Sequence, residues 1–548
     1  MEYVVMQKRS IVLLILLLIG AGYFILFWFP NSTGAQDFNM TFIFEQDEPA
    51  QYPHVIRRLE IRDTIPQTLY RVFAYQHYYF GFPYYIYSAL VLLPARLSAG
   101  WENISLNMLL LRQFVNTLPM IAAILILVYL QTRFESYLKS ISLFVILLAV
   151  PAVVFNNMWI HPDSLVFLFI VLTFFFLDKD DLRFRKSFYL AALFCGLAVA
   201  TKLIGLFFFL AIPYYIFLGW RQARIDTRKA LIVAASFVTI MFAVFVFANP
   251  FLFWESERAF AWKTQSDLHD AMGGGFIVAY NNSPLLWLQV IEKWYGLLIF
   301  VLLAIAAVMI GAFKGDKRLL NQLIAFWAFP FMAYIAVALV IRAKHFPLPI
   351  LLPVFSALPA YFTFFSLPPF TNPLGDYIKK NGLRLVMSIA GFAIVGAQVF
   401  YSFGRDSSMI QENIHREETS PSIQFYATLE QDYLSKIVLD RQLVIFRDVM
   451  MYVPNEPRYD DHFKWGVSNY DIALKNNPDV LIMNKQHLYD YTQPGQLETA
   501  SDPDFALTVQ FYNDILNGTV NGFTQAYQDD FGIVYIRTSL YDHFFSTP

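Results

Sequence analysis

The run IVLLILLLIGAGYFILFWF, residues 11–29, decides the fold class of this chain. It holds no charged residue, and as a helix it is long enough to cross a bilayer core of roughly 30 Å. Lys8 and Arg9 precede it, and Phe27-Trp28-Phe29-Pro30 at its end lacks the small residues of a signal-peptide cleavage site. We therefore expect an uncleaved anchor with a cytoplasmic N-terminus.

The composition of the whole chain supports the same fold class. Hydrophobic residues make up 57%, aromatic residues 18% and charged residues only 15% of the 548 residues, with a mean hydropathy of +0.46. These values are far from those of a soluble domain and predict a polytopic α-helical membrane protein. The net charge of −2 argues against a nucleic-acid partner. The single cysteine, Cys195, excludes an intrachain disulfide framework.

Further apolar runs along the chain predict about eleven transmembrane helices in total. Several of these runs are shorter than a full membrane span, which suits tilted or protein-buried helices around an outward-opening cavity. After the anchor, the predicted spans are residues 114–130, 141–160, 163–177, 188–200, 203–218, 230–251, 294–313, 319–341, 346–367 and 385–403.

One more apolar stretch, residues 78–97, is broken by Gly81, Pro83 and Pro94. If this stretch does not span, every cation-rich loop falls on the same side as Lys8 and Arg9, as the positive-inside rule requires. If it did span, those loops would all lie outside. We therefore predict that residues 78–97 form an aromatic-rich interfacial helix on the outer face.

The composition changes after residue 403, which predicts two domains. Residues 1–403 form a multi-span module whose first outer loop is residues 30–113. Residues 404–548 mix charges with short β-rich pieces at 443–446, 480–483 and 532–536, which predicts a small α/β domain. An odd number of spans from an inner N-terminus places this domain outside the cell membrane. No internal repeat is evident, which weakens an inverted-repeat transporter as an alternative.

The first outer loop carries the segment FEQDEPAQ, residues 44–51. Its adjacent acids, Asp47 and Glu48, are suited to supply a general base together with a neighbour that orients it or tunes its pKa. The alternative is a solvated turn before Pro49, since surface carboxylates are the usual case.

Two later outer turns carry further charges. His161-Pro162-Asp163 lies between two predicted spans, where Asp163 is a candidate either for a polar cavity or for a helix N-cap. Lys202 ends the run Gly196-Leu197-Ala198-Val199-Ala200-Thr201 on the outer side, against the positive-inside trend. Lys202 either snorkels to the interface or binds an anionic group.

The segment Arg342-Ala343-Lys344-His345 places two cations and a histidine at the outer end of another span. Such a cluster favours anion binding, and phosphate is the usual ligand. His269, between Asp267 and Asp270 in a large outer loop, is better explained as a solvated loop residue than as a metal ligand. No metal ligands are assigned.

Taken in order, these motifs resemble the integral-membrane C-type glycosyltransferases, the superfamily of protein O-mannosyltransferases and lipid A aminoarabinose transferases. The resemblance covers roughly the first two-thirds of the chain. It rests on Asp47-Glu48, Pro83-Tyr84-Tyr85, His161-Pro162-Asp163, Gly196-Leu197-Ala198 with Thr201-Lys202, Asn249-Pro250, and Arg342 and Lys344 before Pro347 and Pro349.

The resemblance implies an activity and roles for these residues. The enzyme would move a sugar from a polyprenyl-phosphate donor to an acceptor on the outer face, usually with inversion. Asp47 would be the general base, and Glu48 would help to place it or the acceptor. Lys202, Arg342 and Lys344 would hold the departing phosphate. The residues expected to line the cavity are His161, Asp163, His345, Tyr84 and Tyr85.

The resemblance leaves several points open. No cofactor is assigned, and a divalent metal stays open because some relatives use one. The sugar is open, and the acceptor is a protein, a lipid or a glycan of the cell envelope. A lipid or glycan transporter or flippase is the alternative from another class, although the acidic first loop and the soluble domain suit it poorly. A ligase or polymerase of surface glycans is the nearer alternative.

Overall fold

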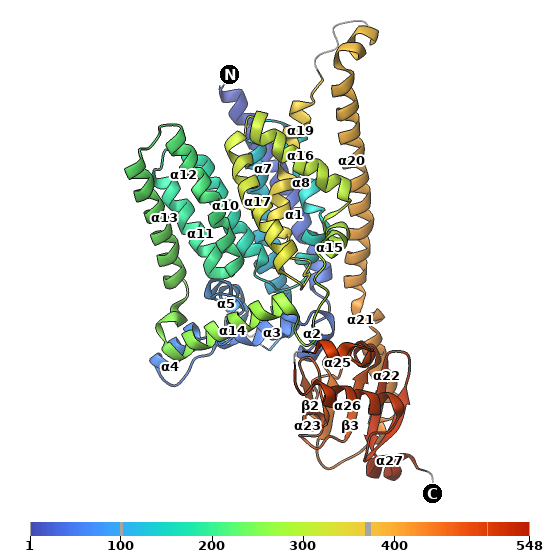
Figure 1. The fold of residues 1–548 in the computed structure, drawn as a ribbon. Helices are drawn as coiled ribbons and strands as arrows, with labels where there is room; N and C mark the ends of the chain where they lie inside the picture. Colours follow the sequence, from blue (N-terminus) through green and yellow to red (C-terminus); the bar gives the residue numbers. More distant parts are fainter. Residues whose placement is uncertain (1, 99–101, 368–373, 501, 547–548) are drawn as a thin grey trace.

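A computed structural model describes residues 2–98, 102–367, 374–500 and 502–546. It has a helical bundle and, at one end of it, a small domain built on a β-sheet (Figure 1). The start of α1 lies at the end of the bundle far from this domain (Figure 1). We call the end of the bundle that meets the sheet domain the domain face.

The bundle and its loops are almost entirely helical. The helices up to residue 247 are α1 (Glu2–Asn31), α2 (Phe38–Phe44), α3 (Asp47–Ile56), η1 (Arg57–Leu59), α4 (Ile65–Phe73), α5 (Phe82–Leu97), α6 (Ile104–Leu111), η2 (Arg112–Thr117), α7 (Leu118–Thr132), α8 (Tyr137–Leu148), α9 (Pro151–Asn156), α10 (Asp163–Asp180), α11 (Lys186–Thr201), η3 (Leu203–Leu210), α12 (Ala211–Arg221) and α13 (Thr227–Phe247). They are followed by η4 (Pro250–Phe253), α14 (Glu255–Gly274), α15 (Leu286–Tyr295), α16 (Leu298–Lys314), α17 (Arg318–Ala338), α18 (Leu348–Ser356), α19 (Leu358–Phe364) and α20 (Leu374–Ile414).

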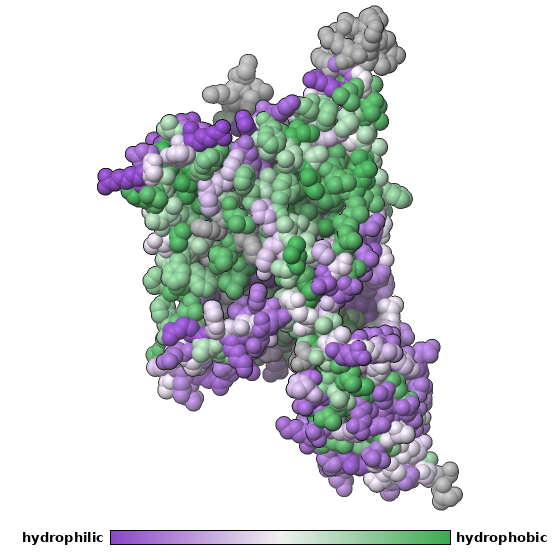
Figure 2. All heavy atoms as spheres, viewed as in Figure 1, coloured by the Kyte–Doolittle hydropathy of each residue, from purple (hydrophilic) through white to green (hydrophobic). Residues whose placement is uncertain are grey.

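The bundle is that of a multi-pass membrane protein. Among the described residues, six helical segments are long and apolar enough to cross a bilayer, and the bent pair α15 and α16 makes a seventh. Figure 2 shows a broad hydrophobic band across the face of the bundle in view, with hydrophilic residues at both ends. The six segments are Met6–Asn31, Ile104–Thr132, Leu203–Arg221, Thr227–Phe247, Arg318–Ala338 and Asn381–Ile414.

Each predicted span is helical, but the predicted count of about eleven is not confirmed, because several of these helices are short or broken. The run 141–160 divides into α8 and α9 at Val150, which is extended because it precedes Pro151. The pair α15 and α16 bends by 87° at Gly296. Gly296 has a φ of +118°, which favours glycine.

Ion pairs fix which loops share the end opposite the domain face. Arg9 contacts Glu135 at 2.6 Å, and Arg133 pairs with Asp178. The cation-rich loops around residues 133–139 and 178–186 therefore lie beside the start of α1. This agrees with the expected gathering of positive charge at the N-terminal end.

The domain face is covered by α2 to α5 and α14 (Figure 1). The predicted interfacial stretch forms α5, whose start is fixed by two hydrogen bonds. The Gly81 N–H donates to the Thr201 carbonyl at 2.8 Å, and the Phe82 N–H donates to Asn249 Oδ1 at 2.9 Å. These bonds hold α5 against the ends of α11 and α13.

The predicted boundary at residue 403 lies inside α20, which continues to Ile414. The sheet domain follows, and its core strand β1 (Leu443–Asp448) is parallel to both β2 (Tyr459–Lys464) and β3 (Val480–Asn484). On the other side β5 (Gly532–Arg537) is antiparallel to β3 and to β4 (Phe523–Gln528), which gives the order β2-β1-β3-β5-β4. Its other helices are α21 (Arg416–Thr419), α22 (Pro421–Asp432), η5 (Leu434–Lys436), α23 (Tyr470–Ala473), α24 (Lys485–Thr492), α25 (Gln496–Thr499), α26 (Phe505–Asn517) and α27 (Thr538–Phe545).

The sheet has a hydrophobic core on each face. Along β5, Ile533 and Tyr535 pack into one core, while Val534 and Ile536 pack into the other, as the two-residue period of a strand requires. The three predicted β-rich pieces are β1, β3 and β5. The outer strands β2 and β4 are only partly buried, and they were not predicted because their sequences are polar.

The sheet domain is attached to the first loop of the bundle. Asn39 donates through Nδ2 to the Val453 carbonyl at 2.9 Å and to Asp461 Oδ2 at 3.0 Å. The Phe42 and Phe463 rings pack edge to face at 4.7 Å. The domain is thus held directly over the acid-bearing segment.

Gly81 offers a test of the α5 position. A Cβ at Gly81 would lie 1.5 Å from the Ala200 carbonyl oxygen, while its φ of −86° is ordinary for any residue. We expect Gly81→Ala to destabilise the detergent-solubilised protein by about 1–3 kcal/mol, as overpacking does. Thermal denaturation measures the effect. Gly22→Ala, where a Cβ would meet nothing within 4 Å, is the control, and equal stability of the two variants would contradict the close approach.

Candidate functional site

The domain face is organised by one buried ion pair between Glu48 and Arg112. Arg112 donates through Nε and Nη2 to the two Glu48 oxygens at 2.7 and 2.5 Å, and both side chains are completely buried. Nη1 of Arg112 donates to the carbonyls of Asn31 and Thr33 at 2.9 and 2.8 Å. Glu48 also accepts the Ile160 N–H at 3.1 Å.

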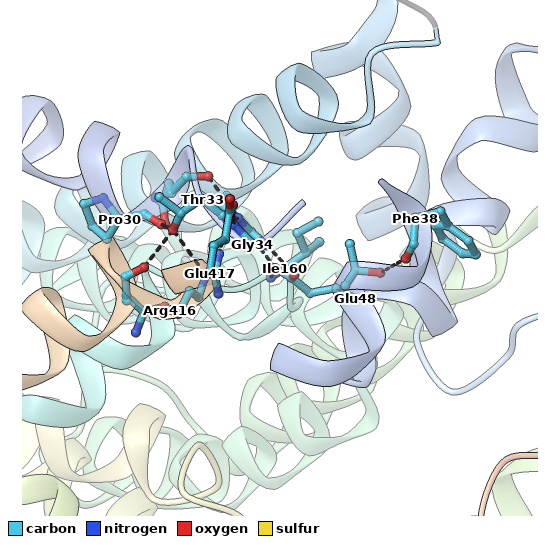
Figure 3. Close-up of polar contacts among 12 residues, drawn as sticks. Pro30, Thr33, Gly34, Phe38, Glu48, Ile160, Arg416 and Glu417 are labelled. Carbon is cyan, nitrogen blue, oxygen red and sulfur yellow. Dashed lines mark hydrogen bonds and ion pairs between the residues drawn. The ribbon is translucent and has the colours of Figure 1, made fainter. Parts of the chain in front are cut away.

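These bonds join four parts of the chain at one point: the end of α1, the start of α3, the π-helical turn η2 and the turn after α9. Figure 3 shows Glu48 beside Ile160, with the Thr33 and Gly34 segment near them. Thr33 in turn donates to the Asn413 carbonyl at 2.7 Å, which adds the end of α20. Both oxygens of Glu48 are therefore occupied by the protein itself.

Asp47, the other acid of the predicted pair, has different surroundings. It is the first residue of α3, where the helix dipole favours a negative charge. Asp47 is exposed, and in the described parts of the chain no hydrogen bond or ion pair engages its carboxylate. Glu48 thus has a structural role, whereas the Asp47 carboxylate is exposed and has no partner among the described residues.

A second charged group is built around Asp163 at the start of α10. Lys202 Nζ donates to Asp163 Oδ1 at 2.8 Å, and His161 Nδ1 lies 2.6 Å from Oδ2. The His161 ring stacks on Trp159 at 4.4 Å with an interplanar angle of 3°, and it lies 4.5 Å from the His345 ring. The structure therefore brings together four predicted site residues from three segments.

Both histidines of this group are neutral near pH 7. Burial lowers the pKa of His161, although the Asp163 carboxylate opposes the shift. Burial also lowers the pKa of His345 well below its usual range, with Asp163 again opposing. Neutral imidazoles keep one nitrogen free to accept a hydrogen bond.

Lys344 and Glu45 form a third charged pair. Lys344 Nζ lies 3.3 Å from Glu45 Oε1 and 3.2 Å from the centre of the Phe155 ring. Burial raises the pKa of Glu45 to about 7; Lys344 lowers it, and Asp47 and Glu48 raise it further. Glu45 therefore changes its charge close to neutral pH.

Arg342, the third predicted phosphate ligand, has other partners. Its guanidinium donates to the carbonyls of Asn281, Ser283 at 3.0 Å and Val340 at 3.1 Å. The same loop is tied to the sheet domain, because the Ala279 N–H donates to the Thr499 carbonyl at 2.9 Å. Arg342 thus anchors a loop between the bundle and the domain.

The predicted cavity residues Tyr84 and Tyr85 are completely buried in α5. The Tyr84 hydroxyl donates to Gln51 Oε1, and the Tyr85 hydroxyl pairs with His77 Nδ1. Phe80, just before α5, packs edge to face on both Tyr84 and His161, at 5.9 and 5.0 Å. The two tyrosines support the first loop, and Phe80 connects this packing with the Asp163 group.

One set of residues has the donor atoms for a metal ion. Ligand atoms of His161, Asp163 and His345 lie within 4.8 Å of one another, and two imidazoles with a carboxylate suit a divalent transition metal. Lys202 already supplies a positive charge to Asp163, however. The Lys202 ammonium therefore already neutralises the Asp163 carboxylate, whose negative charge would otherwise balance a metal cation.

A cavity of about 180 Å³ adjoins these groups. Glu45, Phe155 and Trp159 line one side of it, and Glu412, Asn413 and Arg416 line the side formed by the end of α20 and by α21. A larger cavity of about 690 Å³ lies between α12 and α13. Its lining is almost wholly apolar and includes no residue of the charged groups.

Three residues of the site were not predicted from the sequence. Arg112 is a cation inside an apolar stretch, the same signal that singled out Lys202. Glu45 lies in the acidic segment of residues 44–51, but the prediction used only the adjacent acids Asp47 and Glu48. Trp159 precedes the His161 turn and carries no distinguishing signal in a chain with ten tryptophans.

Comparison with known proteins identifies the class of enzyme. Residues 56–255 match the family model of the dolichyl-phosphate-mannose-protein mannosyltransferases. This region includes the His161 turn and Lys202, but not residues 45–48 or 342–345. The match confirms the resemblance predicted from the motifs and indicates glycosyltransferase activity with a lipid-linked sugar donor. No curated protein sequence matches the chain.

Two solved structures are similar over most of the chain. One is ArnT from Cupriavidus metallidurans in the apo state, at 11% identity and a TM-score of 0.48, with 96% of this chain and 98% of ArnT covered. The other is the archaeal oligosaccharyltransferase AglB from Archaeoglobus fulgidus in complex with an inhibitory peptide and a dolichol-phosphate. Its identity is 11% and its TM-score 0.44, with 85% of this chain and 69% of AglB covered.

The Glu48 and Arg112 pair predicts a large and non-additive effect on stability. Glu48→Ala and Arg112→Ala should each destabilise the protein by about 3–5 kcal/mol, because each leaves a buried charge without its partner. The double variant should lose less than the sum of the two. Thermal denaturation in detergent measures all three. Arg9→Ala, which breaks the exposed pair with Glu135, should cost at most about 1 kcal/mol.

Removal of Lys344 should raise the pKa of Glu45 above 7. The ammonium favours the charged carboxylate, so Lys344→Met leaves burial and the neighbouring acids unopposed. The carboxyl band in infrared titrations, assigned by its loss in Glu45→Gln, should then ionise at higher pH. Lys263→Met, an exposed cation on α14, is the control. An unchanged Glu45 titration in Lys344→Met would contradict the pairing.

Proposed function

We propose that this enzyme transfers a sugar from a polyprenyl-phosphate carrier to an acceptor on the outer face of the cell membrane, with inversion at the anomeric carbon. The observation that supports this best is the exposed carboxylate of Asp47 close to Lys344 at the domain face. Asp47 is near enough for its charge to act on Lys344, whose pKa is lowered by burial and raised first by Glu45 and then by Asp47.

Asp47 is the proposed general base. It accepts the proton of the acceptor hydroxyl as that oxygen bonds to the anomeric carbon. The bond between the anomeric carbon and the phosphate oxygen breaks on the opposite side, so polyprenyl phosphate leaves with the bonding electrons. Glu48 is a positioning residue, because its oxygens hold Arg112 and Ile160 and thereby fix the start of α3.

Lys202 and Lys344 are the proposed phosphate ligands. Each has one carboxylate partner and keeps donor capacity, since an ammonium has three N–H groups. They stabilise the negative charge that develops on the leaving phosphate. Arg342 is the third proposed phosphate ligand. Its present bonds to loop carbonyls mean that the loop at residues 281–283 must shift before Arg342 can reach a phosphate.

The proposed orientation has the N-terminus in the cytoplasm and the sheet domain outside. It is supported by the cation-rich loops at the N-terminal end of the bundle and by the acids and the sheet domain at the other end. The acceptor is a protein, a lipid or a glycan of the cell envelope. No cofactor is assigned to the transfer.

Asp47→Asn tests the mechanism. The variant keeps the size of the side chain but not its basicity, so transfer should fall about 10²–10⁴-fold while the donor still binds. Mass spectrometry of lipid-linked sugars and envelope glycans, from cells with and without the protein, identifies the sugar that is transferred. The same measurement then gives the transfer activity of each variant. Asp63→Asn, an exposed acid of the same loop, should retain full transfer. Transfer by Asp47→Asn at close to the unmodified rate would rule out this base.

Cysteine labelling tests the orientation. A cysteine at Arg224 should react with a membrane-impermeant thiol reagent only after permeabilisation, because the loop between α12 and α13 is proposed to be cytoplasmic. A cysteine at Asp267 on α14 should react in intact cells. Cys195 is buried and serves as the unlabelled background. The opposite pattern would place the site on the inner side.

A further inference from the structure

We propose that the cavity between α12 and α13 is a binding groove for one anionic phospholipid, in the leaflet opposite the domain face. The acyl chains fill the groove, and the phosphate of the headgroup lies at the cations of the loop between the two helices. The proposal goes beyond sugar transfer, because no residue that lines the groove belongs to the charged groups of the candidate site. The proposed orientation makes this leaflet the cytoplasmic one.

The groove has the size of the acyl chains of one leaflet. Its volume of about 690 Å³ is that of a pocket for a drug-sized ligand, roughly 300–1,000 Å³. On α13 the lining runs from Thr227 to Thr239, which is about 18 Å at roughly 1.5 Å per residue. One leaflet takes up half of a hydrocarbon core of roughly 30 Å. The groove is therefore about as deep as one leaflet.

The groove opens to the membrane at the edge of the bundle, where α12 and α13 lie (Figure 1). The buried residues of α13 are Val233 and Phe237. Leu231, Ala235 and Val238 line the groove and are exposed. Because these side chains belong to a helix that is long and apolar enough to cross a bilayer, a hydrocarbon chain is the group that fills the groove.

Trp220 marks the depth at which the headgroup lies. It is exposed, it lines the groove, and its Nε1 donates to Thr227 Oγ1 at 3.2 Å. Tryptophan side chains gather at the headgroup level of a bilayer. The apolar part of the groove thus begins where the hydrocarbon begins, and Arg221 and Arg224 follow Trp220 on the side of the headgroups.

The mouth of the groove carries an excess of positive charge. Residues 221–229 include one acid, Asp226, and four exposed cations, which are Arg221, Arg224, Arg228 and Lys229. Among the residues that the structure describes, no carboxylate pairs with any of the four. Asp226 caps α13 by accepting the Lys229 N–H at 2.7 Å.

This charge selects the headgroup. Arg228 and Lys229 lie in the first turn of α13, where the helix dipole already gives a partial positive charge. An anion at this point is attracted by the cations and by the dipole together. Basic pockets between membrane helices on the cytoplasmic side bind anionic headgroups in this way. A zwitterionic headgroup would bring its ammonium to a mouth whose acid already caps a helix.

Native mass spectrometry of the full-length protein in detergent tests the site. The probes are phosphatidylglycerol and phosphatidylcholine with the same acyl chains. One phosphatidylglycerol should bind with a dissociation constant at least about tenfold below that of phosphatidylcholine. The combined variant Arg221→Gln, Arg224→Gln and Arg228→Gln should abolish this preference, because each cation near an anionic lipid contributes about fivefold. Equal binding of the two lipids to the unmodified protein would overturn the proposal.

The matched control removes three cations elsewhere at the same end of the bundle. Lys8→Gln, Arg9→Gln and Lys139→Gln together change the net charge by the same amount, and none of these residues lines the groove. This variant should keep the preference for phosphatidylglycerol. An equal loss in both triple variants would show a general effect of charge and would overturn the site.

Ala235→Phe tests the groove itself. The phenyl ring would occupy the groove, so both lipids should bind more weakly, and the fold should persist because Ala235 is exposed. Ala393→Phe, at an exposed alanine of α20 that does not line the groove, should bind both lipids normally. Unchanged phosphatidylglycerol binding in Ala235→Phe would mean that the cations act without the groove, which contradicts the proposal.

Two competitors distinguish a phospholipid from other anions. Glycerol phosphate has the charge without acyl chains, and polyprenyl phosphate is the carrier of the proposed donor. Neither should displace phosphatidylglycerol at equal concentration. Displacement by glycerol phosphate would reduce the mouth to a simple anion site, and displacement by polyprenyl phosphate would assign the groove to the carrier. Asp47→Asn should bind phosphatidylglycerol normally, so the lipid site and the proposed transfer are tested separately.

Discussion

The organisation of the domain face depends on one interaction, the buried pair of Glu48 and Arg112. Two charges can remain in such a place only when every donor and acceptor has a partner, and here the guanidinium and the carboxylate also bind three backbone groups. These backbone groups belong to the end of α1 and to the turn before His161. A single ion pair therefore fixes the distance between the anchor helix, the acidic segment and the histidine turn.

The same constraint explains why two adjacent acids have unlike roles. Glu48 is buried and both its oxygens are hydrogen-bonded, whereas Asp47, one residue earlier at the start of α3, is exposed. A helix start separates neighbouring side chains in this way, since successive residues face different directions. The bonds of Glu48 therefore hold the neighbouring Asp47 in place at the start of α3.

The fold class and most of the polar cluster could be predicted from the sequence, because charges at the ends of apolar runs are costly and therefore informative. Asp163, Lys202 and His161 were found by this signal, and the structure joins them. The partnership of Glu48 with Arg112 could not be predicted, because nothing local links residues 64 positions apart. For the same reason the loop contacts of Arg342 required the packed structure. The roles assigned to Asp47 and the lysines remain predictions.

The short helices of the bundle have a consequence for the surrounding lipid. The α11 helix has 16 residues and is therefore about 24 Å long at roughly 1.5 Å per residue, less than the ~30 Å of an average hydrocarbon core. Lys202 follows its last residue, so the bilayer must thin locally or the ammonium must lie below the headgroups. Both cases are responses to the hydrophobic mismatch between the short helix and the bilayer around the site. Bilayer thickness then becomes a variable that sets how readily the phosphate of the proposed donor reaches Lys202.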